Sequence, residues 1–115
     1  MPLLSIQTNV PIPQARQPEL LAAMSKLIAH SIGKPEQYVM VTAVEGPIWM
    51  SGKDGPAAFA DIRSIGGLDA RVNREISQNL CVLLNKTLGI PASRVYLNFT
   101  DIPPAHWGHN GSTFG

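Results

Sequence analysis

The sequence is poor in charge and has no long apolar run, and these absences exclude several classes of protein. Its net charge is +1 and only 15% of its residues are charged, with no basic stripe that could neutralise nucleic-acid phosphates. No apolar run approaches the roughly 18 residues of a membrane span, and no basic segment followed by an apolar one marks a signal peptide. We therefore expect neither a nucleic-acid partner nor a membrane span.

Cysteine is almost absent as well. Cys81 is the only one, so no intrachain disulfide is possible, and the three histidines are scattered without the spacing of a metal motif. A reducing compartment fits this composition, and we expect a cytoplasmic protein without a bound metal, with non-classical secretion left open. The 115 residues predict one domain, residues 1–115. The 44% hydrophobic content beside so few charges indicates extra buried surface, as between subunits.

The chain repeats itself with a period of 56 residues, since Gly33-Lys34-Pro35 recurs as Gly89-Ile90-Pro91. Apolar residues in each copy recur at i, i+4, i+7, i+8 and i+12, which is one face of a helix. Each copy predicts a strand, a helix and a strand, and such a connection favours a parallel pair. We expect an α/β (α+β) fold with a four-stranded mixed sheet and two helices on one face. The two helical faces are Leu20, Met24, Leu27, Ile28 and Ile32, and Ile76, Leu80, Leu83, Leu84 and Leu88.

Two helices on one face leave the other face of the sheet uncovered. The expected strand over residues 38–44 is apolar at both parities, which is typical of burial on both sides. We expect other subunits to cover this face; the alternative is that the loop from Glu45 to Gly55 folds over it. In the last strand, residues 94–101, Tyr96 and Asn98 point together toward this face. They are either a satisfied structural pair or part of a ligand site.

Both ends of the chain carry candidate functional residues. If Met1 is removed, Pro2 becomes a secondary amine, which desolvation can turn into a base active near neutral pH. The alternative is that Pro2 only begins an edge strand. Near the other end, Asn110-Gly111 predicts a hairpin flanked by Trp107 and Phe114, which either wall a pocket or pack the tail down.

Segments along the whole chain, among them Pro2, Ser64-Ile65-Gly66 and residues 94–98, together resemble the macrophage migration inhibitory factor family, which includes D-dopachrome tautomerase. The resemblance covers the whole chain, with about one extra residue between Ile12 and Leu20. It implies the tautomerase superfamily fold, a homotrimer whose sheets surround a central channel, and an active site at each subunit boundary. The matching segments are Pro2, Thr8-Asn9-Val10-Pro11, residues 33–38, Ser64-Ile65-Gly66, Asn73-Arg74, residues 94–98 and residues 110–114.

The resemblance also implies roles for individual residues. Pro2 is the catalytic base, and Lys34 with the backbone N–H of Ile65 binds a substrate carboxylate. Tyr96 and Asn98 arrive from the neighbouring subunit. The aromatic part of the substrate is surrounded by Tyr38, Trp107 and Phe114.

The implied reaction is the keto–enol tautomerisation of a phenylpyruvate-type 2-oxo acid. It moves one proton between oxygen and carbon, so it needs no metal and no organic cofactor. The first alternative is a cytokine-like signalling protein that binds a receptor and keeps a secondary or vestigial site. The second is hydration or dehalogenation of unsaturated acids, for which Arg63 supplies one arginine but no convincing carboxylate is present.

The chain departs from the family pattern at three places. The stretch Ala57-Ala58-Phe59-Ala60 replaces a Cys-x-x-Cys motif, so a thiol oxidoreductase activity is not expected. The tryptophan of the family's tail falls at His109, while Trp107 occupies a usually smaller position, which reshapes the rim of the pocket. Arg63 replaces a histidine beside Ser64 and either adds charge near the carboxylate or points to solvent.

Overall fold

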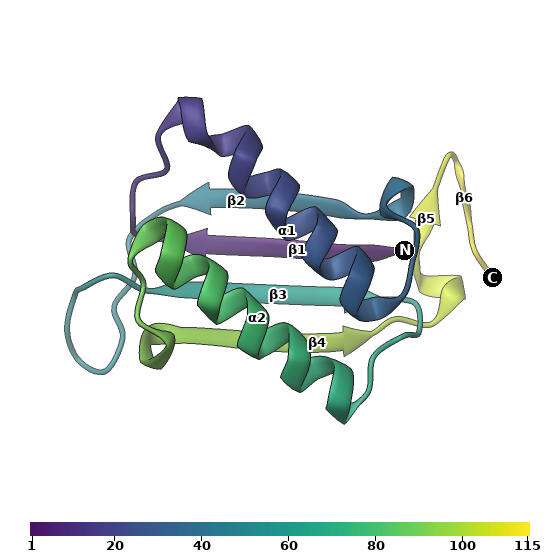
Figure 1. Ribbon diagram of the computed structural model, residues 1–115. Helices are drawn as coiled ribbons and strands as arrows, with labels where there is room; N and C mark the ends of the chain where they lie inside the picture. Colours follow the sequence, from purple (N-terminus) through teal and green to yellow (C-terminus); the bar gives the residue numbers. More distant parts are fainter.

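The computed structural model describes all 115 residues and confirms the predicted repeat. The first unit consists of β1 (Pro2–Thr8), α1 (Gln17–Ile32) and β2 (Met40–Glu45). The second consists of β3 (Ala58–Ser64), α2 (Ala70–Leu88) and β4 (Val95–Asp101). Short 3-10 turns at Gln14–Arg16, Glu36–Tyr38, Ala92–Arg94 and Pro104–His106, and the hairpin of β5 (Gly108–His109) and β6 (Ser112–Thr113), complete the chain. Both helices lie across the same face of the sheet (Figure 1).

The four strands form one mixed sheet in the order β2-β1-β3-β4. The strands of each unit run parallel, and the antiparallel pair β1·β3 joins the units, with Pro2 opposite Ser64 and Thr8 opposite Ala58. The starts of β1 and β2 and the ends of β3 and β4 therefore lie at the same end of the sheet. The carboxy-terminal hairpin lies at this end too (Figure 1).

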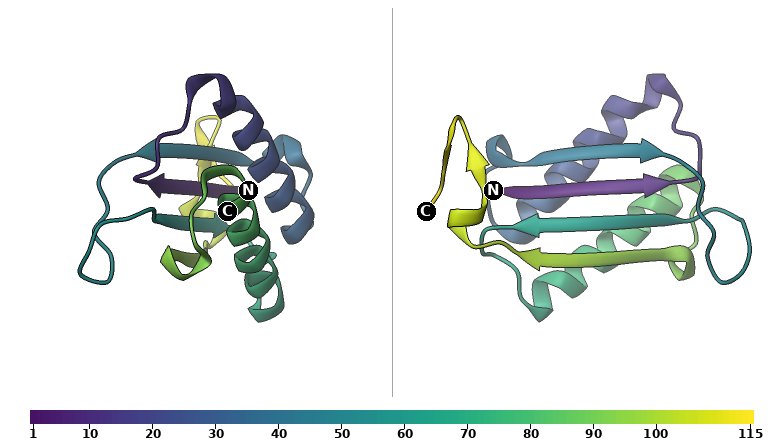
Figure 2. Two further views of the ribbon diagram at one scale, coloured as in Figure 1. Left: turned by 60° about the vertical axis from the view of Figure 1, so that its left-hand side comes forward. Right: turned by 180° about the vertical axis from the view of Figure 1, so that it is seen from behind.

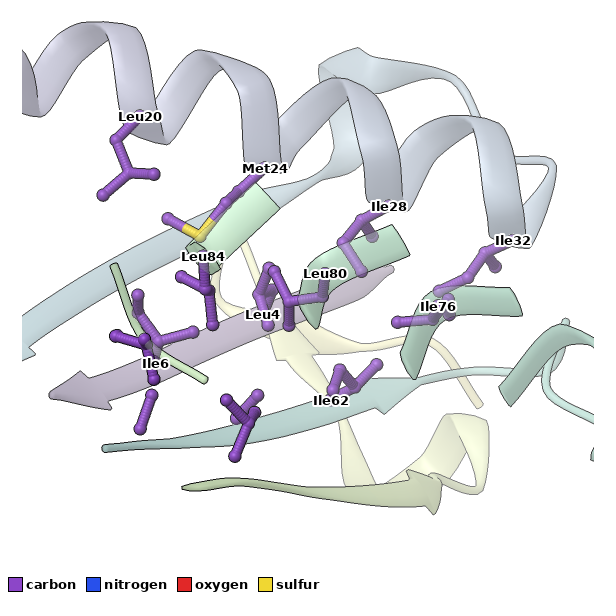
Figure 3. Close-up of a cluster of buried hydrophobic side chains, with 14 of the residues drawn as sticks. Leu4, Ile6, Leu20, Met24, Ile28, Ile32, Ile62, Ile76, Leu80 and Leu84 are labelled. Atoms are coloured by element: carbon purple, nitrogen blue, oxygen red, sulfur yellow. The ribbon is translucent and has the colours of Figure 1, made fainter. Parts of the chain in front are cut away.

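The core lies between the sheet and the two helices, and it confirms the predicted helical faces (Figure 3). The i, i+4 and i+8 positions of both predicted faces are buried, while the i+7 residues Leu27 and Leu83 are half-buried. The i+12 position is buried in α1, at Ile32, and half-buried in α2, at Leu88. Complete burial of a side chain of this size contributes about 1.5–3 kcal/mol relative to exposure. The fully buried large apolar residues are Leu4, Ile6, Met24, Ile28, Ile62, Ile76, Leu80, Leu84 and Ile90.

Glycine ends both helices. Gly33 follows α1 with φ 76° and Gly89 follows α2 with φ 69°, the left-handed conformation that ends many helices. Pro18 lies in the first turn of α1, where its missing N–H costs no helical hydrogen bond. The Asp69 carboxylate accepts a hydrogen bond from the Val72 N–H and caps α2.

The predicted strand over residues 38–44 begins too early. β2 starts at Met40, and Tyr38 belongs to a 3-10 turn that follows Pro35. The N–H of Tyr38 donates to the Pro35 carbonyl at 3.1 Å, and the N–H of Val39 donates to the Glu36 carbonyl at 3.0 Å. Both donors are used within the turn, and pairing with β1 begins at Met40, two residues later than predicted.

The face of the sheet opposite the helices is open (Figure 2, right). Met40, Val44 and Tyr96 are 66%, 51% and 67% exposed on it. The loop between β2 and β3 does not fold over this face, because it extends beyond the strand ends (Figure 2). The alternative cover considered for this face is therefore wrong, while its burial by other subunits stays a prediction. Neither helix combines the length and the apolar character that crossing a bilayer requires.

The Arg94 side chain makes more hydrogen bonds to the loop between β2 and β3 than any other side chain, while Asn9 and Thr8 bond to its end at Gly55 and Ala57. The Arg94 guanidinium donates hydrogen bonds to four backbone carbonyls of the loop at 2.9–3.4 Å. Arg94 ends the 3-10 turn directly before β4, so these bonds attach the loop to the start of that strand. The carbonyls belong to Met50, Lys53, Gly55 and Pro56.

Candidate active site

A cavity of about 400 Å³ opens at the end of the sheet where β1 begins. It combines the amino-terminal segment, the end of the 3-10 turn before β2 and the carboxy-terminal hairpin, three segments far apart in the sequence. Pro2 is fully buried beneath it. The lining residues are Met1, Pro2, Leu3, Gln37, Tyr38, Val39, Met40, Trp107, Gly108 and His109.

The strand pairing explains why Pro2 lies here. Pro2 is the first residue of β1, a position at which a proline's missing N–H does not interrupt a sheet. Its neighbour Leu3 pairs with Met40 of β2, and Pro2 itself pairs with Ser64 of β3. The central strand thus delivers the start of the chain to the floor of the cavity.

Lys34 and Ile65, which the family resemblance assigns to a substrate carboxylate, contact each other, but neither is among the residues that line the cavity. The Lys34 ammonium donates a hydrogen bond to the Ile65 carbonyl at 3.1 Å. Desolvation by burial, and then the positive charge of Lys34, lower the pKa of the chain's amino group, here carried by Met1, below its ordinary value. An amine at this end of the sheet is therefore more often neutral at a given pH than an exposed one.

Only two of the three aromatic residues expected in the site line the cavity. Tyr38 and Trp107 line the cavity, whereas Phe114 is not among its lining residues. The Phe114 ring instead stacks on His109, with ring centroids 5.8 Å apart and planes 7° apart. The Phe114 N–H donates to the Trp107 carbonyl at 3.2 Å, so Phe114 supports the hairpin that carries Trp107 and His109.

The hairpin itself is as predicted. Asn110 and Gly111 have φ values of 51° and 82° between β5 and β6, the geometry of a tight two-residue turn. The tail therefore both packs down and walls the cavity.

Tyr96 and Asn98 lie on the open face, as predicted, but away from Pro2 in the same chain. Pro2 pairs with Ser64, which pairs with Asp101 at the end of β4. Tyr96 is five residues earlier on that strand, a separation of roughly 16 Å at about 3.3 Å per residue. Tyr96 instead lines a cavity at the opposite corner of the sheet with Phe59 and Trp49. A site that contains both Pro2 and Tyr96 therefore needs two copies of the chain.

Some residues at this end of the sheet were not foreseen as site residues. Gln37 and Met40 line the cavity, and the Asp101 carboxylate accepts a hydrogen bond from the Gly66 N–H at 3.0 Å. His109, which was expected only to reshape the rim, also lines the cavity. The pairing of the expected strands could have placed Met40 beside Leu3, but no local pattern predicts a bond between residues 66 and 101. No group of three or more His, Cys, Asp or Glu residues lies close enough together to hold a metal ion.

Two β-α-β units on one mixed sheet, with an amino-terminal proline at the edge of a cavity, define a class of protein, the tautomerase superfamily. The family model described as "Macrophage migration inhibitory factor (MIF)" matches residues 1–115, and the chain belongs to this family.

Relatives and solved structures agree over nearly the whole chain. The macrophage migration inhibitory factor homolog of Trichuris trichiura is 43% identical, with 99% of this chain and 100% of the relative covered. The macrophage migration inhibitory factor of Mus musculus is 40% identical, with 99% of each covered. The crystal structure of the homologue from Prochlorococcus marinus has a TM-score of 0.93 and 40% identity, with 98% of this chain and 99% of that chain covered.

Proposed function

We propose that the protein is a keto–enol tautomerase of phenylpyruvate-type 2-oxo acids, with the amine of Pro2 as its base. The observation that carries this proposal is the placement of Pro2, buried at the floor of a cavity. It directly follows the Met1 amino group, whose pKa burial and then the Lys34 charge lower. A cation beside a desolvated amine favours the neutral form, which accepts a proton. The cavity volume of about 400 Å³ suits an aryl 2-oxo acid.

The reaction moves one proton. The neutral amine takes the proton of the enol hydroxyl, the C–O bond becomes a carbonyl, and the amine returns a proton to the neighbouring carbon. Lys34 and the Ile65 N–H hold the substrate carboxylate, while Tyr38 and Trp107 contact its aryl ring. These contacts orient the reacting carbon toward the amine, and such positioning adds to the proton-transfer effect. The chemistry draws on no metal and no organic cofactor.

Removal of Met1 is a condition of this mechanism. While Met1 is attached, the nitrogen of Pro2 belongs to a tertiary amide and has no basic lone pair. The amine exists only after that peptide bond is cleaved, and it then lies where burial and Lys34 already depress the pKa of the amino group.

The working unit in this proposal is a homotrimer in which Tyr96 and Asn98 of one copy complete the cavity of the next. Two features support it: the exposed apolar residues Met40, Val44 and Tyr96 on the open face, and the distance of Tyr96 from Pro2 within one chain. The mass of the particle in solution, measured by light scattering, tests this assembly.

Replacing Pro2 by glycine tests the base. Pro2→Gly replaces the ring amine by a less basic and less firmly held primary amine, and we expect turnover of enolic phenylpyruvate to fall, at most by the roughly 10²–10⁴-fold that a positioned base contributes, with an unchanged oligomer. Ala58→Gly is the matched control, because Ala58 starts β3 as Pro2 starts β1. Equal turnover in Pro2→Gly and the parent protein would exclude this mechanism.

A second candidate function comes from the relatives. The mouse relative is named for an effect on macrophages, which supports a signalling role in which the surface binds a receptor. Covalent blocking of the Pro2 amine separates the two roles. Receptor affinity that survives the block favours signalling. If no affinity for such a receptor can be measured, the enzymatic role is the only one of the two that remains.

A further inference from the structure

The turn that follows β3 is tied to the end of β4. β3 and β4 remain paired as far as Ser64 and Asp101, and the Ile102 N–H donates to the Ser64 carbonyl at 2.9 Å. Beyond this point the Gly66 N–H bonds to the Asp101 carboxylate at 3.0 Å. The buried Ser64 hydroxyl donates to the Gly66 carbonyl at 2.7 Å. The turn therefore depends on two side chains, one from each strand.

The carboxylate takes the place of a backbone partner. In a parallel pair, alternate residues of one strand bond to the same neighbour. Because Ser64 faces β4, Gly66 faces β4 as well, and a continued sheet would give its N–H a carbonyl on the segment after β4. Asp101 accepts that N–H instead, so the chain leaves the sheet directly after Ser64.

Ile65 lies in the bend that follows β3. Its carbonyl accepts the Lys34 ammonium at 3.1 Å. The Lys34 charge in turn acts on the amino group of Met1, directly before β1. Ile65 thus brings its backbone and the Lys34 cation to the start of β1, where Pro2 lies.

Gly67 keeps the turn close to the end of α1. Its φ is +80°, and a Cβ on it would lie 2.6 Å from Cγ2 of Ile32 and 3.7 Å from Cε of Lys34. No side chain fits there without moving Ile32, so the turn, the end of α1 and the lysine stem form one packed unit. A change in the path of the turn therefore changes the position of the Lys34 ammonium.

We propose that Asp101 is a positioning residue for the carboxylate end of the substrate. Its hydrogen bond to the Gly66 N–H fixes the turn so that the Ile65 amide and the Lys34 ammonium face Pro2 together. Asp101 touches neither the substrate nor the proton in transit. This inference rests on the proposed function, because it assigns the carboxylate to Lys34 and Ile65.

The test compares Asp101→Ala, which removes the acceptor, with Asp101→Asn, which keeps an acceptor oxygen. The substrates are enolic phenylpyruvate and its methyl ester, which lacks the carboxylate charge. For Asp101→Ala we expect KM for the acid to rise about tenfold, which corresponds to about 1.4 kcal/mol, with kcat within about twofold. KM for the ester stays within about twofold. Asp101→Asn restores the KM for the acid.

Asp54→Ala is the matched control, because Asp54 is an exposed carboxylate with no hydrogen bond or ion pair of its side chain. Equal KM values for the acid in Asp101→Ala and Asp54→Ala overturn the inference. A parallel rise for acid and ester in Asp101→Ala also overturns it, since that is the effect of general damage to the cavity.

Calorimetric binding of 3-phenylpropanoate, which cannot enolise, separates the two proposals. If Pro2→Gly retains full turnover, the proposed base is wrong, yet weaker binding of this carboxylate to Asp101→Ala still supports the positioning role. If Pro2→Gly is inactive and both Asp101 variants bind 3-phenylpropanoate as the parent does, only the inference about Asp101 is wrong.

Discussion

The two halves of the molecule have the same architecture but different chemistry. β1 and β3, α1 and α2, and β2 and β4 correspond along the chain at an offset of 56 residues. Ile28 of α1 and Leu84 of α2 are corresponding residues, and both are fully buried. Pro2 corresponds to Ala58, and Lys34 corresponds to Ile90, which is fully buried in the core. The fold depends on the positions that the halves share, and the candidate site is built from positions at which they differ.

The largest effect is expected at a shared position. Ile28→Ala and Leu84→Ala each remove a fully buried side chain that faces the sheet, and each should lower the free energy of unfolding by about 2–5 kcal/mol. Urea denaturation monitored by circular dichroism measures both. A loss in one variant that is several times the loss in the other would show that the halves do not share the core equally.

A smaller effect should separate the halves at Lys34 and Ile90. Lys34→Ala removes a charged donor, and we expect KM for the acid substrate to rise about tenfold or more, since a hydrogen bond to a charged group contributes about 1.5–3 kcal/mol. Its thermal midpoint should change little. Ile90→Ala should lower the midpoint and leave KM unchanged. If both variants lose only stability, Lys34 has no role at the site.

The two helix-ending glycines should respond alike. Gly33→Ala and Gly89→Ala place a side chain in the left-handed region, where each should cost about 1 kcal/mol of unfolding free energy. A Cβ on either residue meets nothing within 4 Å, so backbone strain is the only cause. A markedly larger loss at Gly33 would indicate that its turn also supports Lys34, which activity measurements on the same variant would reveal.

The smallest effect concerns pH. Burial, and to a smaller extent the Lys34 charge, lower the pKa of the chain's amino group, here that of Met1. We expect the same two influences on the Pro2 amine once Met1 is removed. The base acts when neutral, so kcat/KM falls as the pH drops below its pKa. Lys34→Ala removes the repulsion, raises this pKa and should move the acidic limb of the profile to higher pH. A limb that stays in place, measured on protein lacking Met1, would mean that Lys34 does not act on the Pro2 amine.

The sequence predicted those features that depend on local pattern. The helical faces, the helix-ending glycines, the hairpin at Asn110-Gly111 and the mixed sheet follow from spacing that is repeated along the chain. The predicted start of β2 was wrong, because the short-range hydrogen bonds of a 3-10 turn hold Tyr38 outside the strand. Phe114 was expected in the site but stacks on His109.

The bond between Asp101 and Gly66 could not be predicted, because it joins residues 35 positions apart with no local signature. The convergence of Pro2, Tyr38 and Trp107 was predicted from the family resemblance, since the three lie in distant parts of the chain. Long-range placement of this kind depends on the pairing register of the sheet. A shift of one residue in this register would move every side chain of a strand to the opposite face.

The attachment of the β2–β3 loop to Arg94 has a consequence for degradation. Proteases bind their substrates as extended segments, and this loop is exposed and carries Lys53, a residue after which trypsin cleaves. Yet four of its carbonyls converge on one guanidinium, which holds the backbone in a curled path. Cleavage requires an extended segment, so the hydrogen bonds to Arg94 oppose it. We therefore expect Arg94 to slow proteolysis of this accessible loop without covering it.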